Sequence, residues 1–202
     1  PGAGGTVQLH MRPDGKFELM TQPSQQSFDV REGEFITYPG RQKNARHNWL
    51  RFPVTAVNAD DVQAYTHWLN STGKFPGARL CTEFEWERAA RGADGRAYPH
   101  ADRLAPDDAN YDQTYGQDPV SMGMDEPGLH PLSRSLFGVD DLVGNAYEWV
   151  GNSISQKSFT LRGGAYYYDA VTSRTDNRHE PEPGLRHPTA GIRICATMPS
   201  LP

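Results

Sequence analysis

The sequence lacks the features that define several large classes of protein. It contains only two cysteines, Cys81 and Cys195, which cannot form a framework of several disulfides. Its mean hydropathy of −0.72 leaves no room for a membrane-spanning segment. Its 20 Lys and Arg against 25 Asp and Glu give a net charge of −5 without a basic stripe, which argues against nucleic-acid binding.

The motifs of common catalytic sites are missing as well. The chain has no Gly-rich phosphate loop, no His-Glu-x-x-His helix, no paired Cys-x-x-Cys and no Gly-x-Ser-x-Gly turn. Its seven histidines are scattered, and no two of them share the face of a predicted helix. A zinc or iron site is therefore open only to histidines that lie far apart in the sequence.

Glycine, proline and aromatic residues are plentiful. The 20 Gly and 16 Pro in 202 residues favour many loops, whereas 4 Trp, 9 Tyr and 8 Phe supply the core of one domain. Alternating apolar residues predict a hairpin over 6–22 with its turn at 13–16. Further short strands are predicted over 35–38, 145–150, 158–162, 164–168 and 191–196. Residues 93–135 show no sustained period and predict a long loop.

Two helices are predicted, and both begin at good capping residues. Asn58 caps the first helix, which stops at Gly73. Thr82 and Glu85 form a capping box for the second helix, which stops at Gly92. The spacing within the first helix predicts one buried face made of Val62, Tyr65, Trp68 and Leu69. Two helices with short strands and long loops favour the α+β class.

Acidic and turn-forming residues are concentrated between Asp140 and Trp149. A Gly144–Asn145 turn lies between the carboxylates of Asp141 and Glu148. A tight turn can direct several carbonyl oxygens to one point, and an all-oxygen shell is what Ca²⁺ prefers. Two interpretations stay open on spacing alone: a calcium site, or a simple turn whose carboxylates cap amides or pair with arginines.

A second segment combines glycines, tyrosines and arginines. Gly163–Gly164 predicts a sharp change of backbone direction before three consecutive tyrosines. Such segments make good contact surfaces. We therefore expect an unidentified protein or small-molecule ligand to bind at Tyr166, Tyr167, Tyr168, Arg174, Arg178 and His179. The alternative is that alternate tyrosines belong to the core and the charges form internal ion pairs.

Five motifs in a fixed order resemble one superfamily. They are a helix motif over 79–92, a Tyr-Pro-x-x-Asp loop over 98–102, a Phe-Gly-to-Trp motif over 137–149, Arg-Gly-Gly over 162–164 and Gly-Ile-Arg over 191–193. Over roughly residues 52–197 the chain resembles the formylglycine-generating enzyme, or sulfatase-modifying factor, superfamily. Loop residues over 107–110 and 133–135 resemble its non-catalytic branch, which is fused to bacterial serine/threonine protein kinases.

The resemblance implies a C-type-lectin-like α+β fold with two helices, short strands and many long loops. Its opening strand motif is not found here. We therefore interpret residues 1–51 as an N-terminal hairpin and irregular insertion in the same domain as the core of 52–202, with the first strands upstream of residue 1. The resemblance also implies structural calcium, held by the side chains of Asp141 and Glu148 and the carbonyls of Gly144 and Ala146.

The same resemblance argues against oxidase activity. The enzymes bind copper through two cysteines that follow the Gly-Gly motif, and thiolates suit Cu(I). In this chain Tyr168 stands near the first of these positions, and the second falls within 171–173. We therefore expect no copper and no catalytic residues. The family usually has proline at the position of Cys81, so the resemblance implies that Cys81, and likewise Cys195 in the closing strand, is a buried structural thiol.

The main hypothesis is a non-catalytic, regulatory module that binds a ligand or partner. It would be cytoplasmic and part of a larger bacterial signalling protein, such as one with a covalently linked serine/threonine kinase domain. One alternative is a divergent oxidase whose iron or copper is held by histidines. Another is a diversified receptor-binding protein of a retroelement system, in which residues after the Arg-Gly-Gly motif vary.

Overall fold

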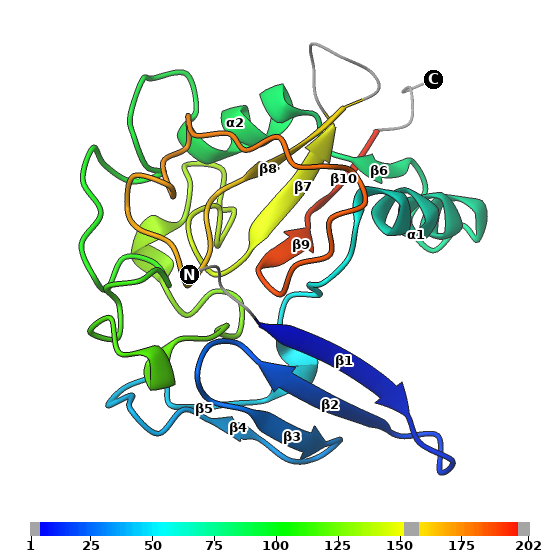
Figure 1. Cartoon of the computed structure of the whole chain (residues 1–202). Helices are drawn as coiled ribbons and strands as arrows, with labels where there is room; N and C mark the ends of the chain where they lie inside the picture. Colours follow the sequence, from blue (N-terminus) through cyan, green and yellow to red (C-terminus); the bar gives the residue numbers. More distant parts are fainter. Residues whose placement is uncertain (1–4, 152–157, 198–202) are drawn as a thin grey trace.

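The computed structural model describes residues 5–151 and 158–197 (Figure 1). The α-helices are α1 (Ala59–Ser71) and α2 (Glu83–Arg91). Short 3-10 helices are η1 (Trp49–Arg51), η2 (Pro119–Ser121) and η3 (Pro131–Ser133). The strands are β1 (Thr6–Met11), β2 (Phe17–Gln22), β3 (Phe28–Arg31), β4 (Ile36–Thr37), β5 (Arg46–His47), β6 (Ala78–Leu80), β7 (Tyr147–Gly151), β8 (Phe159–Arg162), β9 (Ala190–Ile192) and β10 (Ile194–Ala196).

The strands form small separate sheets, as expected for an α+β fold rich in loops. The predicted hairpin is confirmed: β1 pairs antiparallel with β2, and β3 extends this sheet in the order β1-β2-β3. The central sheet has the order β8-β7-β9, with β7 antiparallel to β8 and parallel to β9. Two-stranded pairs join β4 to β5 and β6 to β10. Figure 1 shows the β1-β2-β3 sheet below the central sheet, with α1 and α2 beside the latter.

Both helices begin where the sequence predicts, because both capping boxes form. Asn58 accepts from the backbone N–H of Asp61, and Thr82 accepts from that of Glu85. The predicted buried face of α1 is partly wrong. Ala59, Val62 and Thr66 are buried, whereas Tyr65 and Trp68 lie outside and stack on each other. Thr66 can be buried because its hydroxyl donates to the carbonyl of Val62 one turn earlier.

Two predicted strands near the end of the chain differ from the structure. Residues 164–168 are not a strand, because positive φ angles of 92° at Gly163 and 73° at Gly164 turn the chain inward. The predicted strand over 191–196 is two strands that separate at Arg193. The first half pairs with β7 and the second with β6, so one continuous strand cannot serve both sheets.

The core around the central sheet combines large aromatic residues with small aliphatic ones. Trp149 and Tyr147 of β7 pack with Leu161 of β8 and with Val62 of α1. A second cluster sits under the β1-β2-β3 sheet and includes Trp49 and Tyr38. The predicted long loop over 93–135 contains two 3-10 turns and contributes buried residues of its own, which explains how it stays compact. Within the described residues, neither helix is long and apolar enough to cross a membrane.

Candidate functional site

The turn at the start of β7 is held in an unusual backbone conformation. Asp141, Gly144 and Asn145 all have positive φ, at 56°, 72° and 60°. A Cβ atom on Gly144 would lie 2.2 Å from the carbonyl oxygen of Asn110, so only glycine fits this close approach. The turn is fixed by a hydrogen bond of 2.8 Å from the Gly144 N–H to the Gly163 carbonyl, which ties it to the Arg-Gly-Gly motif.

Asn145 connects the turn to the long loop from inside the protein. Its side-chain oxygen accepts from the Asn110 amide at 3.1 Å and from the backbone N–H of Asp125 at 2.9 Å. Its side-chain nitrogen donates to the Asp125 carbonyl at 3.1 Å. The residue is buried, so each of these bonds replaces a bond to water and would be costly to lose.

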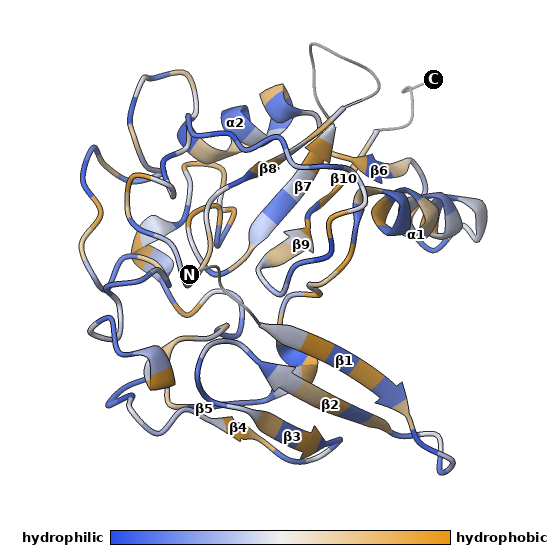
Figure 2. Ribbon diagram, in the orientation of Figure 1, coloured by the Kyte–Doolittle hydropathy of each residue, from blue (hydrophilic) through white to orange (hydrophobic). Residues whose placement is uncertain are grey.

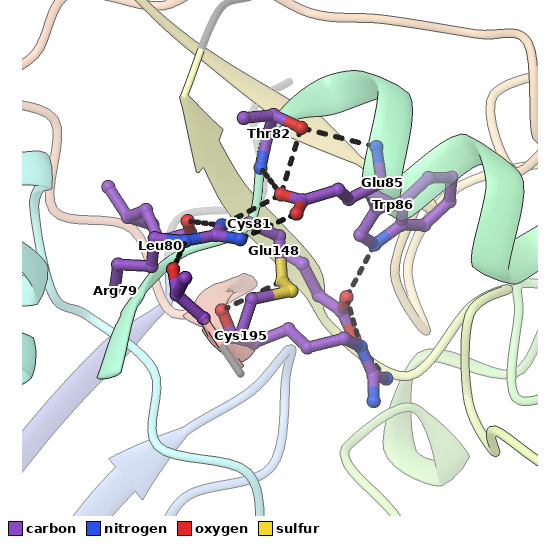
Figure 3. Close-up of a disulfide and its surroundings, with 10 residues drawn as sticks. Arg79, Leu80, Cys81, Thr82, Glu85, Trp86, Glu148 and Cys195 are labelled. Carbon is purple, nitrogen blue, oxygen red and sulfur yellow. Dashed lines mark hydrogen bonds and ion pairs between the residues drawn. A yellow bond between two sulfur atoms is a disulfide. The ribbon is translucent and has the colours of Figure 1, made fainter. Parts of the chain in front are cut away.

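Glu148 makes an ion pair in the interior rather than an open ligand group. Arg193 donates to both of its carboxylate oxygens, at 2.7 and 2.6 Å, and the Trp86 indole donates at 2.6 Å. Figure 3 shows Trp86 of α2 and Glu148 of β7 directed toward each other, next to the Cys81–Cys195 pair. The Glu148 carboxylate raises the pKa of the Arg193 guanidinium against the opposing effect of burial.

Three of the four expected calcium ligands line one cavity of about 610 Å³, and the fourth, Gly144, is not among its lining residues. Asp141, Ala146 and Glu148 line it, together with Asp140 and Arg193. Asp141 accepts from the Gly128 N–H at 2.7 Å, and burial raises the pKa of its carboxyl. Among the described residues, no hydrogen bond uses the carbonyl of Gly144 or Ala146.

The groups around this cavity suit a calcium ion only in part. Two carbonyls that accept no hydrogen bond from the described residues and a nearby carboxylate suit a hard cation, whereas the Arg193 guanidinium on Glu148 opposes one. In the part of the chain that the structure describes, no group of three or more His, Cys, Asp or Glu could hold a metal. The calcium ligand set therefore stays a prediction.

The three consecutive tyrosines have different surroundings. Tyr166 is buried, and its hydroxyl donates to the Pro23 carbonyl at 3.0 Å, so it is part of the core rather than of a contact surface. Tyr168 is half-buried, with its ring 5.2 Å from that of Tyr147. Tyr167 is also half-buried and packs edge-on against Tyr168. His179 is exposed, and its backbone pairs with Leu161 at the edge of β8.

The arginines after the tyrosines are paired within the chain. Arg174 donates twice to Asp176 at 2.8 Å. Arg178 donates to both oxygens of Glu83, at 3.2 and 2.9 Å. Glu83 also binds the buried Arg162 of β8, at 3.0 Å, so α2 is held to the central sheet by charge. These contacts favour the interpretation that the charges of this segment form internal ion pairs.

The cysteines are not the free thiols that we expected. Cys81, between β6 and α2, and Cys195 of β10 form a disulfide, and the chain has no free cysteine (Figure 3). The antiparallel register of β10 on β6 places Cys195 opposite Arg79, two residues before Cys81. Because 114 residues separate the two cysteines, only the tertiary pairing of these strands brings them together.

A buried polar cluster around Asp125 was not predicted. Its carboxylate accepts from Arg41 at 2.5 Å, from Tyr115 at 2.6 Å and from His130 at 2.8 Å. Burial would raise the pKa of Asp125, but the hydrogen bond from His130 and the charge of Arg41 outweigh it and lower that pKa. Arg41 lies between the rings of Tyr38 and Tyr115, 3.7 and 3.8 Å from their centroids. The cluster joins the N-terminal segment to the long loop.

Comparison with known proteins identifies the family. Residues 15–198 match the model of the sulfatase-modifying factor enzyme 1-like domain, so the match includes most of the segment before residue 52. The chain is 33% identical over 157 residues to the inactive C-alpha-formylglycine-generating enzyme 2 of Bos taurus, covering 73% of this chain and 49% of that protein. It is 28% identical over 186 residues to the serine/threonine-protein kinase Pkn1 of Chlamydia trachomatis, covering 82% of this chain and 26% of the kinase.

A solved structure supports the same fold. Treponema denticola variable protein 1 superposes with a TM-score of 0.64 at 16% identity, over 95% of this chain and 98% of that one. The chain spans about half the length of its bovine relative, which is 49% covered. The order of the motifs, the loop-rich α+β fold and the family match over residues 15–198 lead to one conclusion: the chain belongs to the sulfatase-modifying factor, or formylglycine-generating enzyme, family, with its C-type-lectin-like fold.

Proposed function

We propose that this chain is a non-catalytic module that binds a ligand or partner within a larger protein. One observation carries the proposal: the only two cysteines of the chain are joined to each other in the Cys81–Cys195 disulfide. The positions where the resemblance places the copper-binding cysteines hold Tyr168 and residues 171–173, so the segment offers no thiolate pair for Cu(I). The inactive bovine relative supports a non-catalytic role.

The proposed contact surface is smaller than the six residues suggested by the sequence. Tyr167 and His179 offer an aromatic ring and an imidazole at the surface, and Arg178 is 37% exposed at its side chain while bound to Glu83. Tyr166 and Tyr168 would support this surface from inside, because one is buried and the other packs on Tyr147. Arg174 would contribute only by leaving Asp176.

Site-specific photo-cross-linking tests this surface. A photoreactive phenylalanine analogue replaces Tyr167 in one variant and Tyr65, which is exposed on α1, in the control. We expect a defined adduct in producing cells from position 167 and not from position 65. Equal adducts from both positions, or none from position 167, would remove the proposed surface.

A metal and oxygen assay tests the absence of catalysis. Purified protein is treated with Cu(I) and a cysteine-containing peptide, and oxygen consumption is followed. We expect no consumption above that of free Cu(I), because both sulfurs are in the disulfide. Stoichiometric iron or copper held by histidines, together with turnover, would instead establish the oxidase alternative.

The kinase link is tested by the complete reading frame around this segment. We propose a covalently linked serine/threonine kinase domain, and the kinase relative, of which this chain covers 26%, supports such an arrangement. A kinase domain in the same frame is expected, with its Gly-rich loop and its His-Arg-Asp and Asp-Phe-Gly motifs. A reverse transcriptase gene beside a near-repeat of the coding region would instead favour the retroelement alternative. If the reading frame contains no kinase domain, the proposed kinase link fails.

We further propose that Ca²⁺ binds in the cavity lined by Asp141, Ala146 and Glu148. The carbonyls of Gly144 and Ala146 and one oxygen of Asp141 would be ligands, and Glu148 would share its carboxylate between the ion and Arg193. A carboxylate offers about four lone-pair positions, so such sharing is chemically reasonable. The ion would be structural, since it would fix the turn that begins β7.

Thermal unfolding with and without calcium tests this site. The Tm should be higher in excess Ca²⁺ than in EDTA, as for any ligand that binds only the folded state. Asp141→Ala should abolish the shift, whereas Asp140→Ala should keep it, because Asp140 lines the same cavity but binds Arg134. A shift that survives Asp141→Ala would place the ion elsewhere.

The disulfide also bears on where the domain works. Disulfides persist in oxidising compartments and are rare in the cytoplasm. We therefore propose an oxidising compartment for this domain rather than the cytoplasm expected from the sequence. This is tested by alkylating free thiols in freshly lysed cells of the organism that makes the protein. We expect neither cysteine to be modified, and modification of both would favour the cytoplasm instead.

A further inference from the structure

A buried histidine of the long loop faces two hydrogen-bond acceptors. His130 is 4% exposed and lies at the start of η3. Its Nε2 atom lies 2.8 Å from a carboxylate oxygen of Asp125, and its Nδ1 atom lies 3.1 Å from the backbone carbonyl of Asp107. A neutral imidazole carries one N–H and donates one hydrogen bond, whereas an imidazolium donates two. The geometry around His130 therefore suits the protonated ring.

The proton between His130 and Asp125 belongs to the histidine, because the aspartate is held in its ionised form. The Arg41 guanidinium donates to one carboxylate oxygen at 2.5 Å, and the Tyr115 hydroxyl donates to the other at 2.6 Å. Burial alone would raise the pKa of Asp125, but its hydrogen-bond donors and the charge of Arg41 lower that pKa. The carboxylate thus accepts at both oxygens and has no proton to give to the ring.

The charge of this cluster is balanced by groups from three parts of the chain. Arg41 neutralises Asp125, so a positive charge on His130 needs a further anion, and the Asp141 carboxylate acts on it from the segment before β7. Burial lowers the pKa of His130, but its bonds to Asp125 and to the Asp107 carbonyl, with the charge of Asp141, outweigh burial and raise that pKa. The charged and titratable residues around the ring are Arg41, His47, Asp107, Tyr115, Asp125 and Asp141.

His47 shows how the same carboxylate affects a histidine without two acceptors. Its Nε2 atom lies 2.6 Å from the Asn44 carbonyl and 3.4 Å from Asp125. Its buried Nδ1 atom has no hydrogen-bond partner among the described residues, so one N–H satisfies the ring. Burial lowers the pKa of His47 despite the charge of Asp125. Hydrogen-bond geometry therefore favours a neutral ring at His47 and a charged ring at His130.

The bond from His130 to Asp125 closes the loop over 107–133 on the N-terminal segment. Figure 1 shows this loop, in green, above β4 and β5, and Figure 2 shows hydrophilic and hydrophobic residues mixed along it. Asp125 also holds the turn that begins β7, because its backbone N–H and carbonyl both bind the Asn145 side chain. A change at His130 therefore reaches that turn through a single residue.

We propose that the loop over 107–133 is a proton-controlled latch, which a proton on His130 keeps closed and which loosens when that proton leaves. The neutral ring would keep its N–H toward the Asp125 carboxylate, because a bond to a charged acceptor is the stronger one. The Asp107 carbonyl would then lose its donor, and a polar group left without its partner in the interior favours opening. Neither calcium nor the contact surface around Tyr167 enters this latch.

The direction of the pH dependence follows from proton linkage. The pKa of His130 in the folded protein is raised above the value of about 6.5 for an unperturbed histidine. The closing effect of the proton is therefore complete below about pH 6.5 and is lost as the pH rises through the pKa of the folded protein. Opening releases one proton in this window, so its equilibrium constant should grow by up to about tenfold per pH unit.

Hydrogen exchange measured by NMR in EDTA tests the latch. The Asp125 amide, which donates to Asn145, reports on the loop, and the amides of β2, which is paired on both sides, are the reference. We expect the protection factor of the Asp125 amide to fall about tenfold or more between pH 6.5 and about 8.5, while those of β2 stay constant. His130→Gln should remove this fall because glutamine does not titrate, whereas His47→Gln, at the other buried histidine beside Asp125, should keep it.

Nitrogen-15 spectra of the histidines in the unaltered protein give a second test, which holds even where His130→Gln does not fold. Both ring nitrogens of His130 should carry a proton at pH 6.5, and one proton should leave with a midpoint above that pH. This titration, with a loss of protection that disappears in His130→Gln and persists in His47→Gln, supports the latch. A neutral His130 at pH 6.5, an equal fall across β2, or a fall that survives His130→Gln overturns it.

Discussion

Reduction of the Cys81–Cys195 disulfide should destabilise the domain strongly. The bond closes a segment of 114 residues that contains α2 and the three strands β7, β8 and β9 of the central sheet. Next to the bond, β6 and β10 pair over only three residues on each side. Without the bond, little besides this short pairing fixes the last strand to the rest of the fold.

The magnitude follows from the length of the closed segment. For a loop of 114 residues, the loss of chain entropy in the unfolded state corresponds to about 5 kcal/mol. For a domain of this size, 1 kcal/mol shifts the Tm by about 2–4 °C, so the expected shift is roughly 10–20 °C.

The assay compares urea unfolding of oxidised and reduced protein. Mass spectrometry after alkylation verifies that the oxidised sample has no free thiol and the reduced sample has two. The Cys81→Ala/Cys195→Ala double variant should have the same unfolding free energy as the reduced protein, and the reductant should not change it. A difference below about 1 kcal/mol, or free thiols in the oxidised sample, would refute the reasoning.

Three further predictions follow from single residues. Glu148→Gln should lower the unfolding free energy by roughly 3 kcal/mol in urea titrations, since Arg193 would lose its buried partner; a neutral effect would contradict this. Gly144→Ala should abolish stable folding, because its Cβ would lie 2.2 Å from a carbonyl oxygen. Gly116→Ala, at a φ of 80° in open space, should cost only about 1–2 kcal/mol in the same titration, and equal effects of the two would refute the steric argument. The hydrogen bond from Arg79 lowers the pKa of Glu85 to about 2 from 4.5, so stability present above pH 4.5 should be lost as the pH falls toward 2. Acid titration of Glu85→Gln should show a smaller loss over that range, and an unchanged one would count against the assignment.

Local sequence signals predicted the local structure well. The hairpin of β1 and β2 formed because its residues alternate and its turn contains a glycine with a φ of 79°. The caps at Asn58 and Thr82 formed because they need only residues three positions away. Tyr65 and Trp68 were wrongly predicted to be buried. Helical spacing identifies one face of α1, but tertiary packing decides how much of that face is covered.

The sequence predicted the tight turn before β7, but not which residues its side chains contact. Gly144 and Asn145 marked a tight turn, which the structure contains. The partner of Glu148 is Arg193, 45 residues later, and no local rule connects them. The Asp125 cluster was missed for the same reason: Arg41 lies 84 residues earlier, and an isolated aspartate in a loop gives no sign of burial.

The sequence by itself determined the family, the two capped helices, the hairpin and the absence of cysteines after the Gly-Gly motif, because each depends on residue types at fixed short spacings. The tertiary structure decided the disulfide, the Glu148–Arg193 pair and the burial of Tyr166. These depend on which distant segments meet, and the free energy of such contacts is set by packing and burial that no local pattern encodes.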